Sequence, residues 1–249
     1  MELKGRVALV TGGNGGLGQR ICHALARAGC DVAVVYARSQ GDAEKIARDL
    51  VSTGVRAQAL ACDVTDPSQV QALSERALSA FGRVDILVND AAYNKWIPFN
   101  DLDAITFDEW QKILSVNLTG PMLCIKHLAP ALRRNGTGRI VNISSIAGLG
   151  PQGSSIPYAV SKAGLIHLTR CMAVGLAPDI LVNCVAPGYL EDTRATNNLD
   201  PAFRQRAREG SLLKRAADKD DVARQVVGLC ETDSITGQTI VVDAGRFFH

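Results

Sequence analysis

Short apolar segments alternate with longer segments of helical periodicity along this chain, and no other feature of the sequence limits the fold as strongly. Three of the apolar segments, Val7–Val10, Val32–Tyr36 and 86–88, are apolar at each position instead of at every second one. Strands of that kind are typical of a parallel sheet that helices cover on both faces. Parallel strands joined through helices make right-handed crossovers. The alternation therefore predicts an α/β fold built on one doubly wound, mostly parallel sheet of seven strands.

The expected strands are apolar runs, most of them rich in Val, Ile and Leu. They cover Val7–Val10, Val32–Tyr36, Ala57–Ala61, Ile86–Asn89, Arg139–Ile143, Leu181–Val185 and Thr239–Val242. The expected helices lie between them, at about Gly16–Ala28, Asp42–Ser52, Pro67–Phe81, Thr106–Leu132, Tyr158–Gly175 and Asp218–Leu229. Some of the helix ends carry typical signals: Asp66 and Pro67 form a cap with a first-turn proline, and Gly29 and Gly82 are typical stops.

The length of 249 residues and a composition of 47% hydrophobic and 21% charged residues are typical of one globular domain, expected to span 1–249. The net charge of +2, without a dense run of Lys or Arg, argues against nucleic acid or an anionic membrane as the main partner. No apolar stretch approaches the roughly 18 residues that span a bilayer, and the first strand begins too early to leave room for a signal peptide. The region of about 188–210 has few strand-forming residues, which is typical of a lid or binding loop.

Seven cysteines are scattered through the chain without a Cys-x-x-Cys pair, which is typical of buried thiols in a reducing compartment. We therefore expect a cytoplasmic protein. The four histidines have no Cys, Asp or Glu at the spacing of metal ligands, so we expect no catalytic metal.

A glycine-rich segment, Thr11–Gly18, follows the first strand and opens the first helix. Glycines at 12, 16 and 18 let the backbone turn tightly and approach a pyrophosphate, and the helix that follows offers free N–H groups at its start. A flexible strand-to-helix turn is the alternative, because the pattern alone is not specific. We expect a dinucleotide here, bound by Thr11, Gly12, Asn14, Gly16, Leu17 and Gly18.

The residues after the second strand distinguish NADP from NAD. An Asp or Glu at this place binds the ribose 2′-hydroxyl of NAD. This chain has Arg38 and Ser39 instead, a guanidinium and a hydroxyl that suit the 2′-phosphate of NADP. We therefore expect NADP (NADPH) rather than NAD, with a solvated surface arginine as the alternative. Asp63 follows the third strand and is expected with Val64 near the adenine, while capping of the next helix is its alternative role.

Tyr158 and Lys162 begin a predicted helix and lie four residues apart, so both side chains project from one face. A free tyrosine hydroxyl has a pKa of about 10, too high for efficient proton transfer at neutral pH. A Lys ammonium roughly 5 Å away, at an effective dielectric of about 20, favours the phenolate by about 3 kcal/mol. The pair therefore predicts a tyrosine whose pKa is lowered into a useful range, with an incidental pair on an exposed helix as the alternative.

Further polar residues stand where a parallel sheet binds its ligands, beyond the carboxyl ends of the strands. Asn89 ends the fourth strand, Ser144–Ser145 follow the fifth, and Pro187–Gly188 follow the sixth. A serine hydroxyl there can donate to a carbonyl oxygen on which charge develops, although turn formation is the alternative. Asn117 lies inside a predicted helix, where Asn is disfavoured, so we expect it to hold a water or to bend the helix towards Lys162.

Together these motifs resemble those of the short-chain dehydrogenase/reductase family, and within it most the 3-oxoacyl-(acyl-carrier-protein) reductases. The resemblance runs over essentially the whole chain. It is carried by Thr11-Gly-x-x-x-Gly-x-Gly18, Asn89-Asp-Ala-Ala92, Asn117, Ser145, Tyr158-x-x-x-Lys162, Pro187-Gly188 and Ile235-Thr-Gly-Gln238. The resemblance implies a Rossmann domain with an NAD(P)-binding sheet, a mobile lid after Gly188 and commonly a homotetramer, with a dimer also possible.

The resemblance also implies roles for single residues. Tyr158 would be the general acid/base, and Lys162 would lower its pKa and bind the nicotinamide ribose. Ser145 would hold the substrate carbonyl, and Asn117 would anchor a water in the proton relay. The remaining cofactor contacts would come from Asn89, Ala91, Pro187 and Gly188. Candidate wall residues of the substrate pocket are Tyr93, Trp96, Gln152, Tyr189 and Leu190, with ordinary packing as the alternative.

The hypothesis is an NADPH-dependent carbonyl reductase that interconverts a small-molecule ketone and a secondary alcohol. An NAD-dependent dehydrogenase of a sugar, sterol or cyclic alcohol and a non-catalytic dinucleotide sensor are the alternatives. Several positions depart from the family pattern, and three of them stand among the candidate site residues or next to them. Asp90 stands where the family usually has Asn, Ala92 replaces a glycine, and Thr193 follows one position after the place of a usual threonine. Asp90 is expected to perturb nearby charges.

Overall fold

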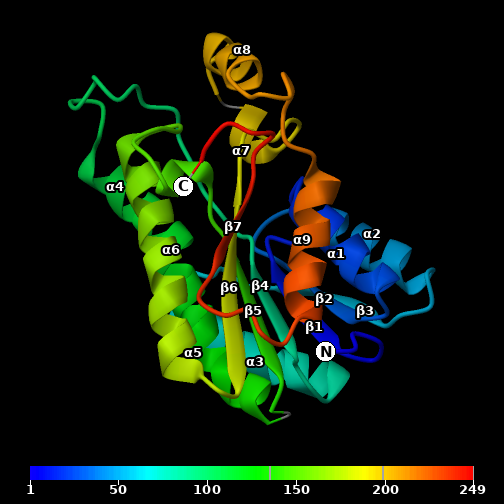
Figure 1. The fold of residues 1–249 in the computed structure, drawn as a ribbon. Helices are drawn as coiled ribbons and strands as arrows, with labels where there is room; N and C mark the ends of the chain where they lie inside the picture. Colours follow the sequence, from blue (N-terminus) through cyan, green and yellow to red (C-terminus); the bar gives the residue numbers. More distant parts are fainter. Residues whose placement is uncertain (135, 198, 249) are drawn as a thin grey trace.

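The computed structural model of the chain describes residues 1–134, 136–197 and 199–248, and within them one sheet holds seven strands (Figure 1). The strands are β1 (Val7–Thr11), β2 (Asp31–Tyr36), β3 (Ala57–Ala61), β4 (Ile86–Asn89), β5 (Gly138–Ile143), β6 (Ile180–Pro187) and β7 (Thr239–Val242). Their order is β3-β2-β1-β4-β5-β6-β7, and every neighbouring pair is parallel. The direction of winding reverses between β1 and β4, which confirms the doubly wound α/β fold.

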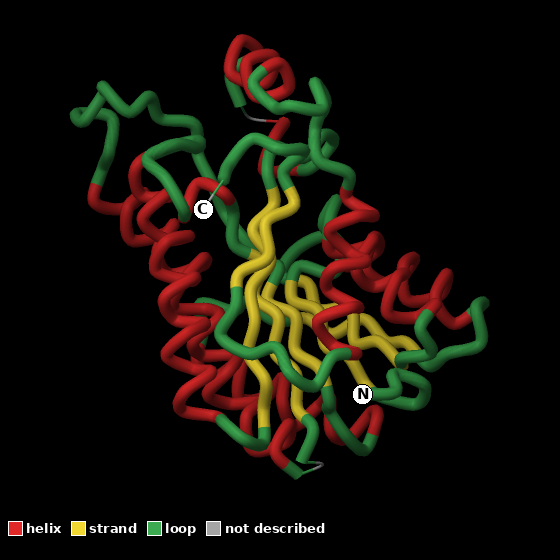
Figure 2. Tube along the Cα trace, viewed as in Figure 1, coloured by secondary structure: helices red, strands yellow, loops and turns green. Residues whose placement is uncertain are grey.

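Helices cover both faces of this sheet (Figure 2). One face packs against α1 (Gly18–Arg27), α2 (Gln40–Val51) and α9 (Lys219–Glu231). The other face packs against α3 (Pro67–Phe81), α5 (Gly120–Arg133) and α6 (Ile156–Leu176). Among the described residues, no helix has both the length and the apolar character that crossing a bilayer requires.

Burial on both faces of the sheet explains why the segment Val7–Val10 of β1 is apolar at every position. Ala8 and Val10 of β1 belong to the core beneath α1, α2 and α9, whereas Val7 and Leu9 belong to the core beneath α3, α5 and α6. Successive side chains of a strand point to opposite faces of the sheet. A strand covered on both faces therefore buries each of its side chains, and each fully buried aliphatic side chain contributes about 1.5–3 kcal/mol.

Several predicted element bounds are confirmed. The strands Ala57–Ala61, Ile86–Asn89 and Thr239–Val242 and the helix Pro67–Phe81 begin and end where the sequence predicts. The Asp66 carboxylate caps α3 by accepting from the backbone N–H groups of Ser68 and Gln69, and Gly82 ends this helix with φ 79°. These two signals are local, and so the sequence is sufficient to place them.

The predicted helix Thr106–Leu132 is confirmed in its extent, since the chain is helical from Phe107 to Arg133, but the sequence did not predict a π-helical turn inside it. The chain forms α4 (Phe107–Leu114), then a π-helical turn at Ser115–Thr119, and then α5. A π turn shifts the register of the side chains that follow it, and such turns are frequent at functional sites.

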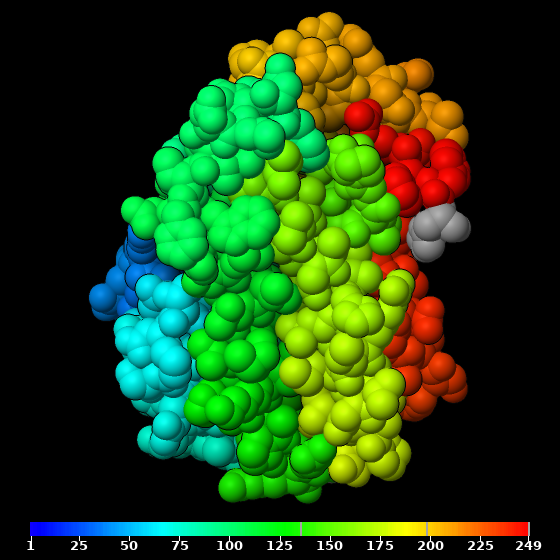
Figure 3. Space-filling model, turned by 90° about the vertical axis from the view of Figure 1, so that its left-hand side faces the viewer, coloured from blue at the N-terminus to red at the C-terminus, as the bar shows by residue number. Residues whose placement is uncertain are grey.

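The described residues of the 188–210 segment are more regular than the sequence indicated, since they include α7 (Arg194–Asn197) and α8 (Pro201–Glu209). The Asp200 carboxylate caps α8 by accepting from the backbone N–H of Phe203, and Pro201 occupies the first turn. This is the same Asp-Pro signal that starts α3. Figure 3 shows the 188–210 segment at one end of the molecule, next to the residues that follow β4. The rings of Trp96 and Phe203 pack together between these two segments, with their centroids 5.0 Å apart.

Candidate active site

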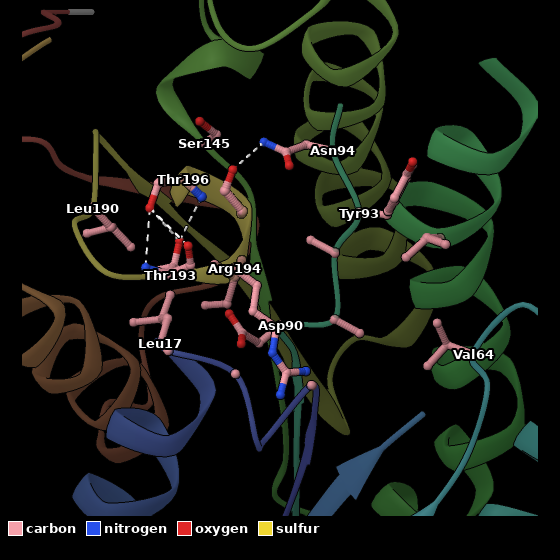
Figure 4. Close-up of a pocket in the computed structure, with 18 of the residues that line it drawn as sticks. Leu17, Val64, Asp90, Tyr93, Asn94, Ser145, Leu190, Thr193, Arg194 and Thr196 are labelled. Atoms are coloured by element: carbon pink, nitrogen blue, oxygen red, sulfur yellow. Dashed lines mark hydrogen bonds between the residues drawn. The ribbon is translucent and has the colours of Figure 1, made fainter. Parts of the chain in front are cut away.

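A cavity of about 510 Å³ lies at the carboxyl ends of the strands, and Figure 4 shows part of its lining. It brings together the glycine-rich segment, the residues that follow β2 to β6, the start of α6 and the 188–210 segment. The predicted residues that line it are Gly12, Asn14, Gly16, Leu17, Arg38, Asp63, Val64, Ala91, Ser145, Tyr158, Lys162, Pro187 and Gly188. Residues from distant parts of the sequence therefore share one cavity.

The other predicted site residues do not belong to this lining. They are Thr11, Gly18, Ser39, Asn89, Asn117, Gln152 and Tyr189. Thr11 is buried, and its hydroxyl accepts from the backbone N–H groups of Asp90 and Ala91 at 3.1 and 3.2 Å. The Asn89 side chain donates to Asn142 at 2.8 Å. Thr11 and Asn89 thus hold the ends of β1, β4 and β5 in register beneath the cavity.

The glycine-rich segment makes tight approaches that a side chain would prevent. Gly12 has φ 66°, and a Cβ atom there would lie 2.9 Å from Cα of Ala91. A Cβ atom on Gly18 would lie 2.2 Å from the carbonyl oxygen of Gly12. Helix α1 begins at Gly18 without a side-chain cap, so its first N–H groups remain available to an anion. This backbone cradle fits the diphosphate of a dinucleotide.

The residues that follow β2 form the rim of the cavity next to the glycine-rich segment. The Asn14 side chain donates to the carbonyl oxygens of Arg38 and Ser39 at 2.8 and 3.3 Å, which ties the turn after β2 to the glycine-rich segment. Ser39 has φ 60° and its hydroxyl does not cap α2. Asp63 accepts from the backbone and the hydroxyl of Thr65, so it shapes its own turn while it lines the cavity.

Tyr158 and Lys162 stand on the first turns of α6, close to the end of β5. The Ser155 hydroxyl caps α6 by accepting from the backbone N–H of Tyr158. The Lys162 ammonium donates to the carbonyl oxygen of Ile143 at 2.8 Å and lies 5.8 Å from the centre of the Tyr158 ring. The cap and this bond place both functional groups at the cavity.

The structure distinguishes the two neighbouring serines. Ser144 donates its hydroxyl to the carbonyl oxygen of Lys162 at 2.8 Å and so fixes α6 against β5. Ser145, which lines the cavity like Ser144, accepts from the backbone N–H of Ala147 at 3.2 Å, and its hydroxyl also forms a hydrogen bond with Tyr158. The two serines therefore serve different purposes, although the sequence places them side by side.

The predicted lowering of the pKa of Tyr158 is not found. Burial raises the pKa of the Tyr158 hydroxyl, a hydrogen bond with Ser145 lowers it, and the charge of Asp90 raises it. Burial also lowers the pKa of Lys162 to about 8, against the opposing effect of Asp90. The prediction counted only the attraction between the two groups at an effective dielectric of about 20, whereas Lys162 is buried and Tyr158 is half-buried, and desolvation disfavours both charged forms.

Asn117 is buried in the π turn and connects two segments. Its side-chain oxygen accepts from the backbone N–H of Tyr93 at 2.8 Å, and its amide donates to the Tyr93 carbonyl at 2.9 Å and to the Ser161 hydroxyl at 3.1 Å. Asn117 therefore fixes the segment after β4 to α6 next to Lys162. This satisfied arrangement explains an Asn inside a helical region.

Several lining residues were not predicted as site residues. They are Asp90, Asn94, Lys112, Thr193, Arg194 and Thr196. The Asn94 amide donates to the carbonyl of Ala195 at 2.9 Å, and the Thr193 and Thr196 hydroxyls lie 2.8 Å apart (Figure 4). The departures from the family pattern drew attention to Asp90 and Thr193. No local pattern marks Asn94 or Lys112, because only the fold brings them to the cavity.

Asp90 is a partly buried carboxyl group in the wall of the cavity. Burial raises its pKa to about 7, while the Lys162 ammonium lowers it. One of its carboxyl oxygens lies 2.9 Å from where a Cβ atom on Gly18 would be. Asp90 therefore places a titratable group beside the cradle for the diphosphate.

Replacing Asp90 by Asn is expected to stabilise the protein more at about pH 8 than at about pH 5. The pKa of Asp90 is raised from 3.8 to about 7, so between these values the folded chain keeps a proton that the unfolded chain has lost. The free energy of unfolding of the parent therefore falls as the pH rises through this window, and the amide removes that loss. Urea unfolding at both pH values measures the difference. The exposed Asp103→Asn is the control, and a benefit of Asp90→Asn that is equal at both pH values would contradict the prediction.

Two of the predicted wall residues lie apart from the main cavity. Gln152 lines a second cavity of about 500 Å³ with Gly150, Pro151, Gly210, Arg246 and Phe247. Tyr189 is half-buried, and its carbonyl accepts from the backbone N–H of Ala217 at 2.9 Å. Within the described part of the chain, no cluster of three or more His, Cys, Asp or Glu side chains is arranged to hold a metal ion.

Comparisons with known proteins agree with this geometry. Residues 6–203 match the family model described as short chain dehydrogenase. The chain is 41% identical over 241 residues to the protein named as ketoacyl reductase 2 of the granaticin polyketide synthase of Streptomyces violaceoruber, with 96% of this chain and 95% of that protein covered. It is 36% identical over 243 residues to a 3-oxoacyl-(acyl-carrier-protein) reductase of Staphylococcus epidermidis, with 96% and 98% covered. A solved double mutant of a short-chain dehydrogenase/reductase from Serratia marcescens matches with a TM-score of 0.90 and 30% identity, over 99% of both chains.

Proposed function

This chain belongs to the short-chain dehydrogenase/reductase family and is an NAD(P)-dependent oxidoreductase that acts on CH–OH or C=O groups, and from this premise we propose that it is an NADPH-dependent carbonyl reductase. Its substrate class is a ketone of the 3-oxoacyl kind, which is reduced to a secondary alcohol. The names of the ketoacyl and 3-oxoacyl reductases to which it is similar support this class.

One observation carries the proposal: Ser145, Tyr158 and Lys162 line the same cavity as the backbone cradle at Gly12 and Gly16. A nicotinamide cofactor supplies hydride chemistry when it is bound in such a cradle. The Ser145 hydroxyl donates to the carbonyl oxygen of the substrate and holds it next to Tyr158, whose hydroxyl gives this oxygen its proton.

The supporting groups act on these two hydroxyls. The Lys162 ammonium favours the phenolate that forms when Tyr158 gives up its proton, and it is placed to bind the nicotinamide ribose. Asn117 acts as a positioning residue, because its hydrogen bonds hold α6 and the segment after β4 together. Burial raises the pKa of the Tyr158 hydroxyl, which favours its protonated form.

The choice of NADPH rests on the end of β2. Arg38 lines the cavity there, Ser39 follows it, and no carboxylate stands at the position that binds the 2′-hydroxyl of NAD. A guanidinium offers paired N–H donors that match a phosphate group.

The proposed function is tested with the purified protein and a panel of ketones and secondary alcohols. Each is assayed with NADPH, NADH and their oxidised forms by the absorbance of the reduced nicotinamide. We expect reduction of 3-oxoacyl thioesters or related ketones with NADPH. Activity confined to NAD and a sugar or cyclic alcohol, or cofactor binding without turnover over the whole panel, would reject the proposal.

Replacing Arg38 by Ala is expected to weaken NADPH binding by about 10- to 100-fold and to change NADH binding by no more than about threefold. A hydrogen bond to a charged group contributes about 1.5–3 kcal/mol, and only NADPH carries the 2′-phosphate. Fluorescence titration of both cofactors measures the two dissociation constants. Arg48→Ala is the matched control, because Arg48 is an exposed arginine on α2 that pairs with Glu44 at 4.0 Å. Equal weakening of both cofactors by Arg38→Ala would remove the assigned role.

A further inference from the structure

The 188–210 segment reaches the rim of the cavity after β2 through Arg194, the first residue of α7 (Figure 4). One guanidinium nitrogen of Arg194 lies 3.2 Å from a carboxylate oxygen of Asp42 and 3.4 Å from the hydroxyl of Ser39. Asp42 lies in the first turn of α2 and Ser39 immediately precedes this helix. A residue after β6 is thus in contact with the turn that follows β2.

A second guanidinium already lines this rim. Arg38 immediately precedes Ser39, and the amide of Asn14 fixes the backbone of both residues. Two arginines from distant parts of the chain therefore line the cavity at Ser39: Arg38 precedes it in the chain, and the Arg194 guanidinium contacts its hydroxyl. That is the donor set expected around a phosphate group, which accepts several charge-assisted hydrogen bonds at once.

The present partner of Arg194 holds it only weakly. The side chains of Arg194 and Asp42 are 60% and 63% exposed, and ion pairs this exposed contribute little to stability because water screens them. A phosphate dianion offers more charge and more acceptor oxygens than one carboxylate. It can therefore displace Asp42 from Arg194 without a large loss.

We propose that Arg194 is a second specificity residue for the 2′-phosphate of NADPH, and that it exchanges Asp42 for this phosphate when the cofactor binds. The proposal rests on the proposed function and deepens it, because it adds a contact from the 188–210 segment to the site of Arg38. Asp42 then acts as a competitor for Arg194. The carboxylate also repels the phosphate, so its removal strengthens binding of the phosphorylated cofactor.

The start of α7 also has a contact on its other side. There the Asn94 amide donates to the Ala195 carbonyl. Asn94 belongs to the segment after β4, and Asn117 connects this segment to α6 through its bonds to Tyr93 and Ser161. The start of α7 is therefore held between the segment after β4 and the turn after β2.

The test uses two probes that differ only in the 2′-phosphate, adenosine 2′,5′-bisphosphate and adenosine 5′-monophosphate. Calorimetry gives the dissociation constants for the parent and for Arg194→Ala, Arg194→Lys, Asp42→Asn and Arg38→Ala. The exposed Arg206→Ala on α8 is the control for loss of a positive charge in the same segment. Arg194→Ala is expected to weaken the bisphosphate by about tenfold and to change the monophosphate by less than about twofold.

Two further results are expected. Arg194→Lys retains part of the affinity for the bisphosphate, because a lysine keeps the charge without the paired donors. Asp42→Asn strengthens the bisphosphate by about two- to fivefold and leaves the monophosphate unchanged. This gain of affinity cannot come from a variant that fails to fold.

The opposite outcomes overturn the proposal. Equal weakening of both probes by Arg194→Ala would place Arg194 elsewhere on the cofactor, and an Asp42→Asn protein that binds the bisphosphate no better would remove the competition. If Arg38→Ala abolishes the preference for the bisphosphate and Arg194→Ala does not change it, the NADPH assignment stands and only the role of Arg194 fails. A parent protein without any preference for the bisphosphate would overturn both.

Discussion

Replacing Tyr158 by Phe is expected to lower kcat for carbonyl reduction by about a thousandfold or more, while the dissociation constant for NADPH stays within about threefold. The phenyl ring keeps the volume that α6 packs around and removes only the hydroxyl that gives its proton to the substrate. General acid catalysis by a positioned side chain contributes about 10²- to 10⁴-fold to the rate. Steady-state kinetics with the best ketone of the panel, together with cofactor titration, measures both quantities.

The control for this variant is Tyr36→Phe, which removes a hydroxyl from the half-buried tyrosine at the end of β2. It is expected to leave kcat unchanged. A Tyr158→Phe protein with the turnover of the parent would exclude Tyr158 as the acid. Loss of both turnover and cofactor affinity would show that the hydroxyl is required for the structure of the site and not for proton transfer alone.

Replacing Gly18 by Ala is expected to weaken cofactor binding by at least about a hundredfold and to lower the free energy of unfolding by about 1–3 kcal/mol. The added Cβ atom would lie 2.2 Å from the carbonyl oxygen and 2.9 Å from the carbonyl carbon of Gly12. Both are backbone atoms of the cradle, so the overlap cannot be relieved by rotating a side chain. The cradle must open, and the N–H groups at the start of α1 then lose their alignment with the diphosphate.

Gly228→Ala is the matched control, because Gly228 lies inside α9 and an added Cβ atom there meets nothing within 4 Å. That variant is expected to gain up to about 1 kcal/mol, since Ala is the better helix former. Urea unfolding and NADPH titration of the two variants measure the contrast. A Gly18→Ala protein that binds NADPH as tightly as the parent would contradict the role of this cradle.

The parts of the fold that the sequence predicted depend on neighbours along the chain. The cap at Asp66 and the stop at Gly82 are set by groups within a few residues, and the apolar strands reflect burial on both faces. The π turn within the helix after Thr106 was not predicted, for the opposite reason. This turn packs against α6, where a Cβ atom on Gly164 would lie only 2.9 Å from the Leu118 side chain, and this contact joins distant segments.

Among the residues of the candidate site, too, some could be predicted from short segments of the sequence and others could not. The glycine-rich segment, Ser145, Tyr158 and Lys162 carry signals of type and spacing, and all of them prove to contribute to the lining of one cavity. Asn94 and Arg194 carry no such signal, because each acts through a partner more than a hundred residues away in the chain. The pKa of Tyr158 was predicted in the wrong direction, since a spacing of four residues reveals a neighbouring charge and does not reveal burial.

The sequence by itself determined the order of strands and helices and predicted the glycine-rich segment, Ser145, Tyr158 and Lys162 as site residues, because periodicity, glycine and side-chain chemistry are properties of short segments. Only the tertiary structure decided what the Ser144 hydroxyl binds, in which direction burial shifts the pKa values of Tyr158 and Asp90, and which arginine of the 188–210 segment meets the turn after β2. Those properties depend on desolvation and on contacts between distant segments, and both arise when the sheet brings the carboxyl ends of its strands to one edge.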